Sequence, residues 1–456
     1  MNKKLLPLDT TIYFLPFIVI SFWYLLNNNA RSRFILRDAS FTLLSKYKVI
    51  IFIFVLIIFI VAAISINALV IRIKKMNVIY NMKFIFVITY VLFVLIPIVF
   101  DKIFNQHIFQ LINNLFRVSY ISPIFADLNT ILTGIGCDSV KNIGDKIYCD
   151  TKNDVIWNYP TFLLNLRFLA INSKLTFLIG ILMTLIFALV LIMFVNLNAT
   201  QKTFLMFLSF SPPLLLVVNR GNFDLVILCC LAIVGLLLNK NQKYALEYSY
   251  LLIFTAAILK FYAIFTLPLL LLFNNKIKNY FYFIVASAIF LMVSYKDIWV
   301  LSKYIGRDMS GSLGLSVFIS HLNGNLNSDL NLFTIGGILF VIVFLYYLYF
   351  FNTKLSNVQI ENYNNFIFII LSFAFTCTWF LSSNYYYRLV LLIFVIPFYF
   401  HHKSCDIENY LGITCFLSFY FSYRTFGLIL NITLIPIIVF NILILQKLLR
   451  KKSIYD

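Results

Sequence analysis

The stretch Asn219-Arg220-Gly221-Asn222-Phe223-Asp224 lies between two apolar runs, residues 204–218 and 225–238. An arginine, an aspartate and two amide side chains therefore stand where the chain is otherwise hydrophobic. Ionisable groups inside a membrane are costly unless they are paired, hydrated or functional. Arg220 and Asp224 are four residues apart, so they share one face if a helix begins at Gly221. The stretch predicts either a structural ion pair or a functional site, in which Asn219 and Asn222 add hydrogen-bond donors and Arg220 binds phosphate.

The composition around this stretch is that of a membrane protein. The 456-residue chain is 62% hydrophobic and 12% charged, with a mean hydropathy of +0.93. A soluble domain of this size cannot bury so much apolar surface. The net charge of +19 does not require nucleic acid. Many of the basic residues lie in short polar segments, where the positive-inside rule and anionic lipid headgroups account for them.

Apolar runs recur along the whole chain and predict an all-α, polytopic transmembrane protein with about 12 to 14 membrane segments. Several runs are shorter than the roughly 20 residues that an upright helix needs, so we expect them to be half-helices or to continue through polar residues. The predicted segments are 11–26, 49–71, 84–100, 175–195, 204–218, 225–238, 248–273, 280–293, 332–351, 366–381, 390–400, 411–423 and 426–445.

The distribution of lysine and arginine predicts the topology and the domains. Placing the basic segments in the cytoplasm puts both termini there and leaves two long polar segments outside, 101–174 and 295–331. This topology requires two half-helices in 248–273, where Lys260 interrupts the apolar run. The first outer loop is aromatic and aliphatic enough to predict short helices along the membrane surface. We expect residues 1–83 to add two transmembrane helices to one membrane domain, 84–456.

Two motifs of the first outer loop contain candidate site residues. Asp127, in a stretch with apolar neighbours, could act as a general base, or it could cap a helix that begins near Leu128. Asn158-Tyr159-Pro160 follows a tryptophan and precedes the next span. Proline disfavours helix at Tyr159, so the motif predicts a helix start with aromatic anchors at the interface, or else an aromatic wall for a substrate.

Two further cations stand in apolar surroundings. Lys260 has no carboxylate nearby in sequence, and it predicts either a lysine that reaches water or one that neutralises a lipid phosphate. Arg388 follows three tyrosines in Asn384-Tyr385-Tyr386-Tyr387-Arg388. These residues predict either an aromatic belt with a headgroup contact or the rim of a phosphate site.

The seven cysteines predict no metal site. Cys137 and Cys149 both fall in the first outer loop and could form a disulfide if that side of the membrane is oxidising. The other five lie in or beside apolar runs, where they act as small apolar residues. Zinc-type spacing, a phosphate-binding P-loop and a dinucleotide fingerprint are all missing from the sequence. No cofactor is therefore expected.

The order of these motifs resembles a bacterial family of integral-membrane glycosyltransferases with the GT-C fold, the polyprenyl-phosphate-mannose-dependent mannosyltransferases. The resemblance covers about residues 84 to 400. It lies in Phe125-Ala126-Asp127-Leu128, in Asn158-Tyr159-Pro160, in the hexad 219–224, in Leu259-Lys260-Phe261-Tyr262, and in residues 384–389. Each motif is short, so the specificity comes from their order.

The resemblance implies an inverting hexosyltransferase of the bacterial inner membrane, with mannose as the expected sugar. It would move the sugar from a polyprenyl-phosphate donor to a hydroxyl of a glycolipid or cell-surface glycan, on the outer side. Asp127 would be the base, and Arg220, Lys260 and Arg388 would bind the donor phosphate. Tyr262, Tyr387 and Asp224, which would orient Arg220, would shape the site. A transporter, a lipid-linked glycan flippase or a glycan polymerase is the alternative, because transporters also keep charges near the membrane midplane.

Overall fold

The computed structural model divides the chain into two compact units, Met1–Leu92 and Phe93–Asp456. The structure describes residues 88–104, 108–115, 118, 124–136, 140–143, 146–149, 155–156, 159–169, 172–193, 199–240, 243–271, 277–304, 312–313, 315, 341–342, 344–349, 351–352, 358, 363, 365–381, 384–400, 408–409, 411–412, 415–416, 419 and 427–452. The predicted spans 11–26 and 49–71, most of 332–351 and 411–423, and the predicted domain 1–83 lie outside these residues.

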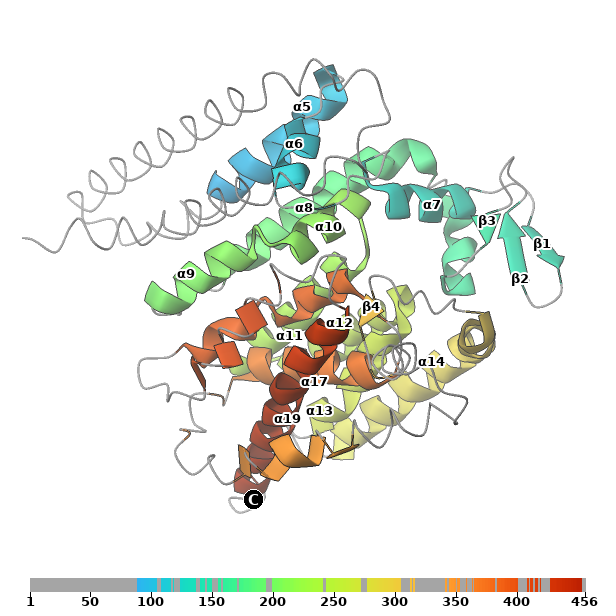
Figure 1. The fold of residues 1–456 in the computed structure, drawn as a ribbon. Coiled ribbons are helices and arrows are strands. Elements are labelled where there is room, and N and C mark those ends of the chain that lie inside the picture. Colours follow the sequence, from blue (N-terminus) through green and yellow to red (C-terminus); the bar gives the residue numbers. More distant parts are fainter. Residues whose placement is uncertain are drawn as a thin grey trace, which may run out of the picture. The chain divides into compact units, whose positions relative to one another are not determined.

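The described part of the chain is predominantly helical (Figure 1). It begins with the π-helical turn η2 (Val91–Leu95), which leads into α5 (Ile96–Phe104), and α6 (Ile108–Leu115) follows. Asp101 of α5 accepts hydrogen bonds from the backbone N–H groups of Ile108 and Phe109 at 2.6 and 2.8 Å. This carboxylate therefore satisfies two donors at the start of α6, which a helix cannot pair by itself.

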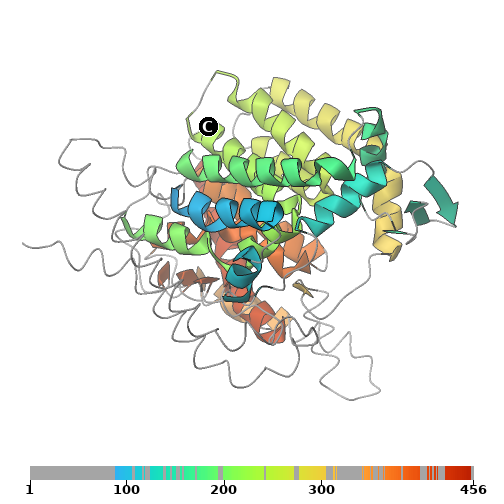
Figure 2. The same cartoon turned by 90° about the horizontal axis from the view of Figure 1, so that it is seen from above.

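The first predicted outer loop is partly helical, as expected, and also contains strands that the sequence did not predict. Its helices are α6, α7 (Ala126–Ile135) and the 3-10 helix η3 (Thr161–Leu169). Between them, β1 (Val140–Ile143), β2 (Lys146–Cys149) and β3 (Val155–Ile156) form an antiparallel sheet in the order β1-β2-β3. Figures 1 and 2 both show this sheet at the edge of the unit, away from the packed helices.

The centre of the second unit is α11 (Asp224–Asn239), which packs against α8 (Thr176–Met193), α12 (Ala245–Leu259) and α17 (Phe366–Leu381). Most of its residues are buried. A helix that is hydrophobic on all sides is expected in such a central position. α17 coincides with the predicted span 366–381, and α19 (Gly427–Lys452) contains most of the predicted span 426–445 and packs against α17.

Two predicted spans are interrupted in ways that proline and lysine explain. The run 204–218 is divided between α9 (Ala199–Leu208) and α10 (Pro212–Arg220), because Pro212 and Pro213 favour the start of a helix. The run 248–273 is divided at Lys260 into α12, then the 3-10 helix η5 (Phe261–Thr266) with α13 (Leu267–Leu271). The predicted interruption at Lys260 is therefore present, and the segment after it is a 3-10 helix followed by a short α-helix.

Two other elements differ from the prediction. α14 (Ile277–Tyr304) extends beyond the predicted span 280–293, so the first part of the predicted second outer loop is helical. The run 390–400 is covered by the 3-10 helices η8 (Tyr386–Leu392) and η9 (Ile396–Tyr399) rather than by an α-helix. The two-residue strand β4 (Ser312–Leu313), which follows α14, pairs in antiparallel fashion with β5 (Asn384–Tyr385), which directly precedes η8.

Some of the described helices are apolar enough for a membrane. Ser173–Met193 and Ile277–Tyr295 have the length and composition of spans, and α10 with α11, bent by 115°, would together make a third. Large apolar side chains on α8 and α14 are exposed, among them Leu189 at 59% and Met292 at 75%. These features are compatible with a helical membrane protein, in which lipid would cover such faces.

Candidate functional site

The charged residues singled out in the sequence meet in one place. Asp127, Arg220 and Asp224, Lys260 and Arg388 come from α7, from the junction of α10 and α11, from the break after α12, and from η8. Together with Asn222 and Tyr262 they form a continuous set of contacts, called the charge cluster below. Its members are Asp127, Arg220, Asn222, Asp224, Lys260, Tyr262 and Arg388.

The junction of α10 and α11 positions three members of the cluster. α10 ends at Arg220 because Gly221 is left-handed, with φ 61° and ψ 38°, and its N–H donates to the carbonyls of Val217 and Val218. Glycine adopts this conformation without the steric cost that other residues incur. α11 begins only at Asp224, after a bend of 115° between the helices. Arg220 and Asp224 therefore belong to two different helices.

Phe125 fixes the start of α7 against this junction. Among the described residues, it is the one residue other than glycine that has a positive φ, 65°. Its backbone N–H donates a hydrogen bond to the carbonyl of Asn219 at 2.7 Å. Its ring occupies the space beside Gly180 of α8, where an added Cβ would lie 2.3 Å from Phe125 Cδ2. Phe125 thereby places Asp127, two residues later, opposite Arg220.

The first ion pair of the cluster joins Asp127 to Arg220. Arg220 Nε lies 2.9 Å from both carboxylate oxygens, and Nη2 lies 2.7 Å from Oδ1. The Arg220 side chain is 29% exposed and that of Asp127 is 12% exposed. Planar, multidentate contact of this kind is the strongest that arginine makes with a carboxylate.

The second ion pair joins Asp224 to Lys260 and is more deeply buried. Lys260 Nζ lies 2.7 Å from Asp224 Oδ2, and the Tyr262 hydroxyl donates to Oδ1 at 2.5 Å. The Asp224 side chain is fully buried and that of Lys260 is 11% exposed. Lys260 reaches Asp224 because its own backbone is extended (φ −151°, ψ 125°) where α12 ends.

Asn222 connects the two ion pairs. Its Nδ2 donates to Asp127 Oδ2 at 2.7 Å, and its Oδ1 accepts from Lys260 Nζ at 2.6 Å. The same Oδ1 accepts from the backbone N–H of Asp224 at 3.0 Å. An amide has both the donor and the acceptor that these neighbours require, whereas a carboxylate or a hydrocarbon lacks one or both.

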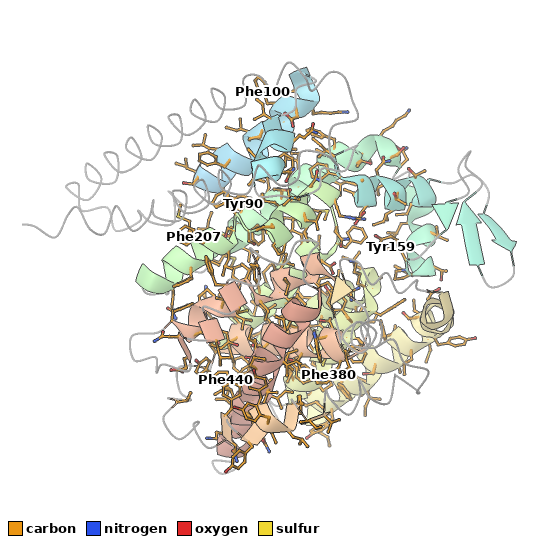
Figure 3. The ribbon with its side chains drawn as sticks, viewed as in Figure 1. Tyr90, Phe100, Tyr159, Phe207, Phe380 and Phe440 are labelled. Atoms are coloured by element: carbon orange, nitrogen blue, oxygen red, sulfur yellow. The ribbon has the colours of Figure 1, made fainter. Side chains whose placement is uncertain are left out.

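Two further predicted residues adjoin the pairs. Arg388 Cζ lies 5.0 Å from the centre of the Tyr262 ring, which is within cation–π range. Tyr159, labelled in Figure 3, packs edge to face on Phe223 of the hexad, with ring centres 6.3 Å apart. Burial raises the pKa of the Tyr159 hydroxyl above its usual range, with Asp127 and Asp224 adding to the shift and Arg220 and Arg388 opposing it.

Two interpretations drawn from the sequence were wrong. Asp224 does not orient Arg220; it binds Lys260 and Tyr262, because the glycine turn ends the helix between Arg220 and Asp224. Asp127 does not cap a helix: α7 begins at Ala126, and the carboxylate pairs with Arg220 instead. Lys260 has no carboxylate nearby in sequence and pairs instead with Asp224, 36 residues away.

Some predicted site residues remain predictions. Asn158 and Cys137 lie outside the described residues, as do the side chains of Cys149 and Tyr387, although the backbones of these last two belong to β2 and η8. The disulfide is therefore still a prediction. Asn219 is fully buried, and its backbone carbonyl accepts a hydrogen bond from the Phe125 N–H.

The sequence reasoning missed two residues that hold the site's surroundings. Asp297 of α14 accepts hydrogen bonds from both the backbone N–H and the hydroxyl of Thr161, each at 2.9 Å. This bond fixes the start of η3, directly after Tyr159 and Pro160. Phe125 is the other: it entered the prediction only as part of a motif, and its contact with Gly180 of α8 was not predicted. Each of these two contacts joins residues that are at least 55 positions apart in the sequence, so no local pattern reveals it.

The charge cluster has the chemistry of an anion site. Its three cations face two carboxylates, which leaves one formal positive charge in excess. Of the four charged residues in the two ion pairs, Arg220 has the most exposed side chain. Within the described residues, no group of three or more His, Cys, Asp or Glu could hold a metal ion.

Comparison of the chain with models of protein families, with curated proteins and with solved structures gave no match.

Proposed function

We propose that this protein is an integral-membrane glycosyltransferase that uses a polyprenyl-phosphate-linked hexose as its donor. The expected sugar is mannose, and the acceptor is a hydroxyl of a glycolipid or a cell-surface glycan. The expected location is the bacterial inner membrane, with the charge cluster at the outer leaflet. One observation carries the proposal: Asp127, Arg220, Lys260 and Arg388, from four separate segments, belong to one connected cluster.

The apolar surroundings of the cluster support a lipid-linked substrate. The helices that carry it, α10 and α11, are buried over most of their length, while α8 and α14 expose large apolar side chains. Lipid covers such faces in a membrane protein, and a prenyl chain could lie along them. Charges that the bundle keeps inside are then expected to serve a function rather than stability alone.

The charges of the cluster suit the donor phosphate. A sugar linked to polyprenyl phosphate is a phosphodiester with one negative charge, which would balance the one positive charge in excess. When the glycosidic bond breaks, the phosphate becomes a monoester and gains negative charge. Arg220, Lys260 and Arg388 are cations that would stabilise this developing charge, which is a main source of catalysis in enzymes.

The transfer itself requires a base, for which Asp127 is the candidate. The acceptor oxygen would form a bond to the anomeric carbon as the bond from that carbon to the phosphate oxygen breaks. The acceptor's proton would pass to the Asp127 carboxylate, and polyprenyl monophosphate would leave. Attack opposite the phosphate inverts the configuration. General-base catalysis of this kind contributes about a hundredfold to ten-thousandfold in rate.

A transporter or flippase of lipid-linked glycans is the second candidate. The bent pair α10 and α11 and the extended break at Lys260 favour it, because broken helices form the substrate sites of many transporters. Such a protein would need the same cations for a phosphate, but it would need no base. The carboxylate of Asp127 would then serve only to hold Arg220.

The two candidates differ in their products. Purified protein in proteoliposomes is given radiolabelled polyprenyl-phosphate hexoses, with and without candidate glycolipid acceptors. The glycosyltransferase produces a labelled acceptor and polyprenyl phosphate in equal amounts. Label that moves across the bilayer with every donor still intact, and no product with any acceptor, would contradict the proposal and favour transport.

A further inference from the structure

We infer that the donor phosphate and Asp127 compete for Arg220, so that binding of the phosphate releases the carboxylate to act as a base. This inference rests on the proposed function and adds an order of events: the donor binds first, and only then can the acceptor be deprotonated. The state described by the structure is accordingly a closed one, in which Asp127 is engaged by Arg220.

The hydrogen bonds of Asp127 are the first support. A carboxylate has about four lone-pair sites for hydrogen bonds. Arg220 Nε contacts both oxygens, Nη2 contacts Oδ1, and Asn222 Nδ2 contacts Oδ2, at distances between 2.7 and 2.9 Å. Three N–H donors thus engage both oxygens, and the Asp127 side chain is only 12% exposed. An acceptor hydroxyl would have to compete with them for the carboxylate, and release of Arg220 removes two of the three.

The two ion pairs differ in how readily they can open. Arg220 is 29% exposed and extends from the last turn of α10, so its long side chain can turn toward an incoming anion. Asp224 is fully buried, and Lys260 and Tyr262 both hold it. The contacts between Arg220 and Asp127 are therefore the ones that a ligand would exchange.

A phosphate is a suitable replacement for the carboxylate at Arg220. The guanidinium group binds phosphate and carboxylate in the same planar, bidentate manner. Arg388, whose Cζ lies 5.0 Å from the centre of the Tyr262 ring, is a further cation of the same cluster. A phosphate that bridges the two arginines gains a contact that the Asp127 carboxylate lacks in the closed state.

Asn222 then determines which oxygen of Asp127 becomes the base. Its Nδ2 holds Oδ2, and its own orientation is fixed because Oδ1 accepts from Lys260 and from the Asp224 backbone. When Arg220 leaves, Asp127 keeps its position through Oδ2. Oδ1, which Arg220 Nη2 had occupied, becomes available to the acceptor hydroxyl.

Competition for Arg220 can be measured by binding alone, without transfer. Farnesyl phosphate, a short prenyl phosphate, is titrated into the full-length protein in detergent, as wild type, Asp127→Asn, Arg220→Gln and the double variant. Removal of the competing charge should tighten binding to Asp127→Asn by about tenfold, the effect of a hydrogen bond to a charged group. The gain should disappear in the Arg220→Gln background.

Three controls separate this effect from simpler ones. Glu247→Gln makes the same change of charge at an exposed carboxylate, paired with Lys278 at 2.8 Å, and should leave binding unchanged. Farnesol tests whether the prenyl chain binds alone, and inorganic phosphate tests whether a soluble anion suffices. Asp127→Ala also removes the carboxylate and should show the same gain in binding of farnesyl phosphate. It replaces Asp127→Asn in the comparison if that variant does not fold.

The outcomes distinguish this inference from the proposed function. Binding of farnesyl phosphate that is unchanged or weaker in Asp127→Asn, or a gain that persists without Arg220, overturns the competition but leaves the donor site intact. A gain seen with inorganic phosphate and not with farnesyl phosphate supports the competition and contradicts the lipid-linked donor. Absence of binding by every variant to both phosphates overturns both.

Discussion

Lys260 donates from Nζ to Oδ1 of Asn222 over 2.6 Å, and this bond links the two ion pairs of the cluster through their side chains. On the other side of the amide, Nδ2 holds Asp127, the carboxylate paired with Arg220. The cations expected to bind a phosphate and the carboxylate expected to act as a base thus belong to one hydrogen-bonded unit. Changes at the amide should affect both pairs.

Replacement of Asn222 by leucine should destabilise the protein strongly. The substitution keeps a similar volume but leaves Asp127, Lys260 and the Asp224 N–H each without one partner inside the protein. Each unsatisfied buried polar group costs about 1–3 kcal/mol. Thermal unfolding in detergent measures the effect, with Asn172→Ala as the control, since that variant loses one exposed bond to Lys174 N. Equal effects of the two variants would contradict the bridging role of Asn222.

The two lysine–carboxylate pairs of the described residues should differ in their effect on stability. Lys260→Met leaves Asp224 buried without its cation, which costs about 3–5 kcal/mol in comparable pairs. Lys278→Met breaks an equally short but exposed pair, at 2.8 Å, and should produce no measurable change. The midpoints of thermal unfolding test the difference. A second change, Asp224→Asn, should restore part of the loss at Lys260, and its failure to do so would show that charge is not the cause.

Gly180→Ala should destabilise the protein, although alanine is the better helix former. The new Cβ would lie 2.3 Å from a ring atom of Phe125, which already has a left-handed backbone and packs against Gly221. Overpacking of this kind costs about 1–3 kcal/mol. Gly136→Ala is the control, because its nearest neighbour, Asn172 Cβ, would lie 3.1 Å away. An increase in stability for Gly180→Ala would exclude Phe125 as the residue that fixes α7.

The Tyr159 hydroxyl should make stability depend on pH in the alkaline range. Burial raises its pKa in the folded protein, so the unfolded chain loses this proton first as the pH rises. The stabilisation is complete below the ordinary pKa of about 10 and is lost as the pH rises above it. Tyr159→Phe should therefore gain in melting temperature relative to wild type between about pH 8 and pH 11. A constant difference across that range would contradict the pKa shift.

The order of motifs in the sequence located the residues of the site, but not their pairing. Arg220 and Lys260 were identified because charges are rare in apolar runs, and Asp127 and Arg388 because they lie in short motifs whose order resembles a known family. The partner of Arg220 was assigned wrongly, because the four-residue spacing to Asp224 suggested one helix. Gly221 was the signal against it, since glycine after arginine favours a helix end. The true partner is 93 residues away in sequence, beyond any local pattern.

The helices and strands were likewise predicted only in part from the sequence. Apolar run length predicted α17 with its bounds, and a lysine in the middle of an apolar run predicted the break between α12 and η5. The small sheet β1-β2-β3 was not predicted, because its strands have two to four residues and no extended alternation of apolar and polar side chains. The length of α14 was also missed, because polar residues near its end resemble a loop.

The most direct test of the account is the rate of hexose transfer by Asp127→Asn compared with wild type, at saturating polyprenyl-phosphate hexose. Glu247→Gln, at an exposed carboxylate in the first turn of α12, the opposite end of that helix from Lys260, serves as the matched control and should keep the wild-type rate. Loss of the base should lower kcat by at least about a hundredfold, while KM for the donor stays equal or falls because Arg220 remains. Transfer by Asp127→Asn at the wild-type rate would contradict the central claim that this cluster catalyses the reaction.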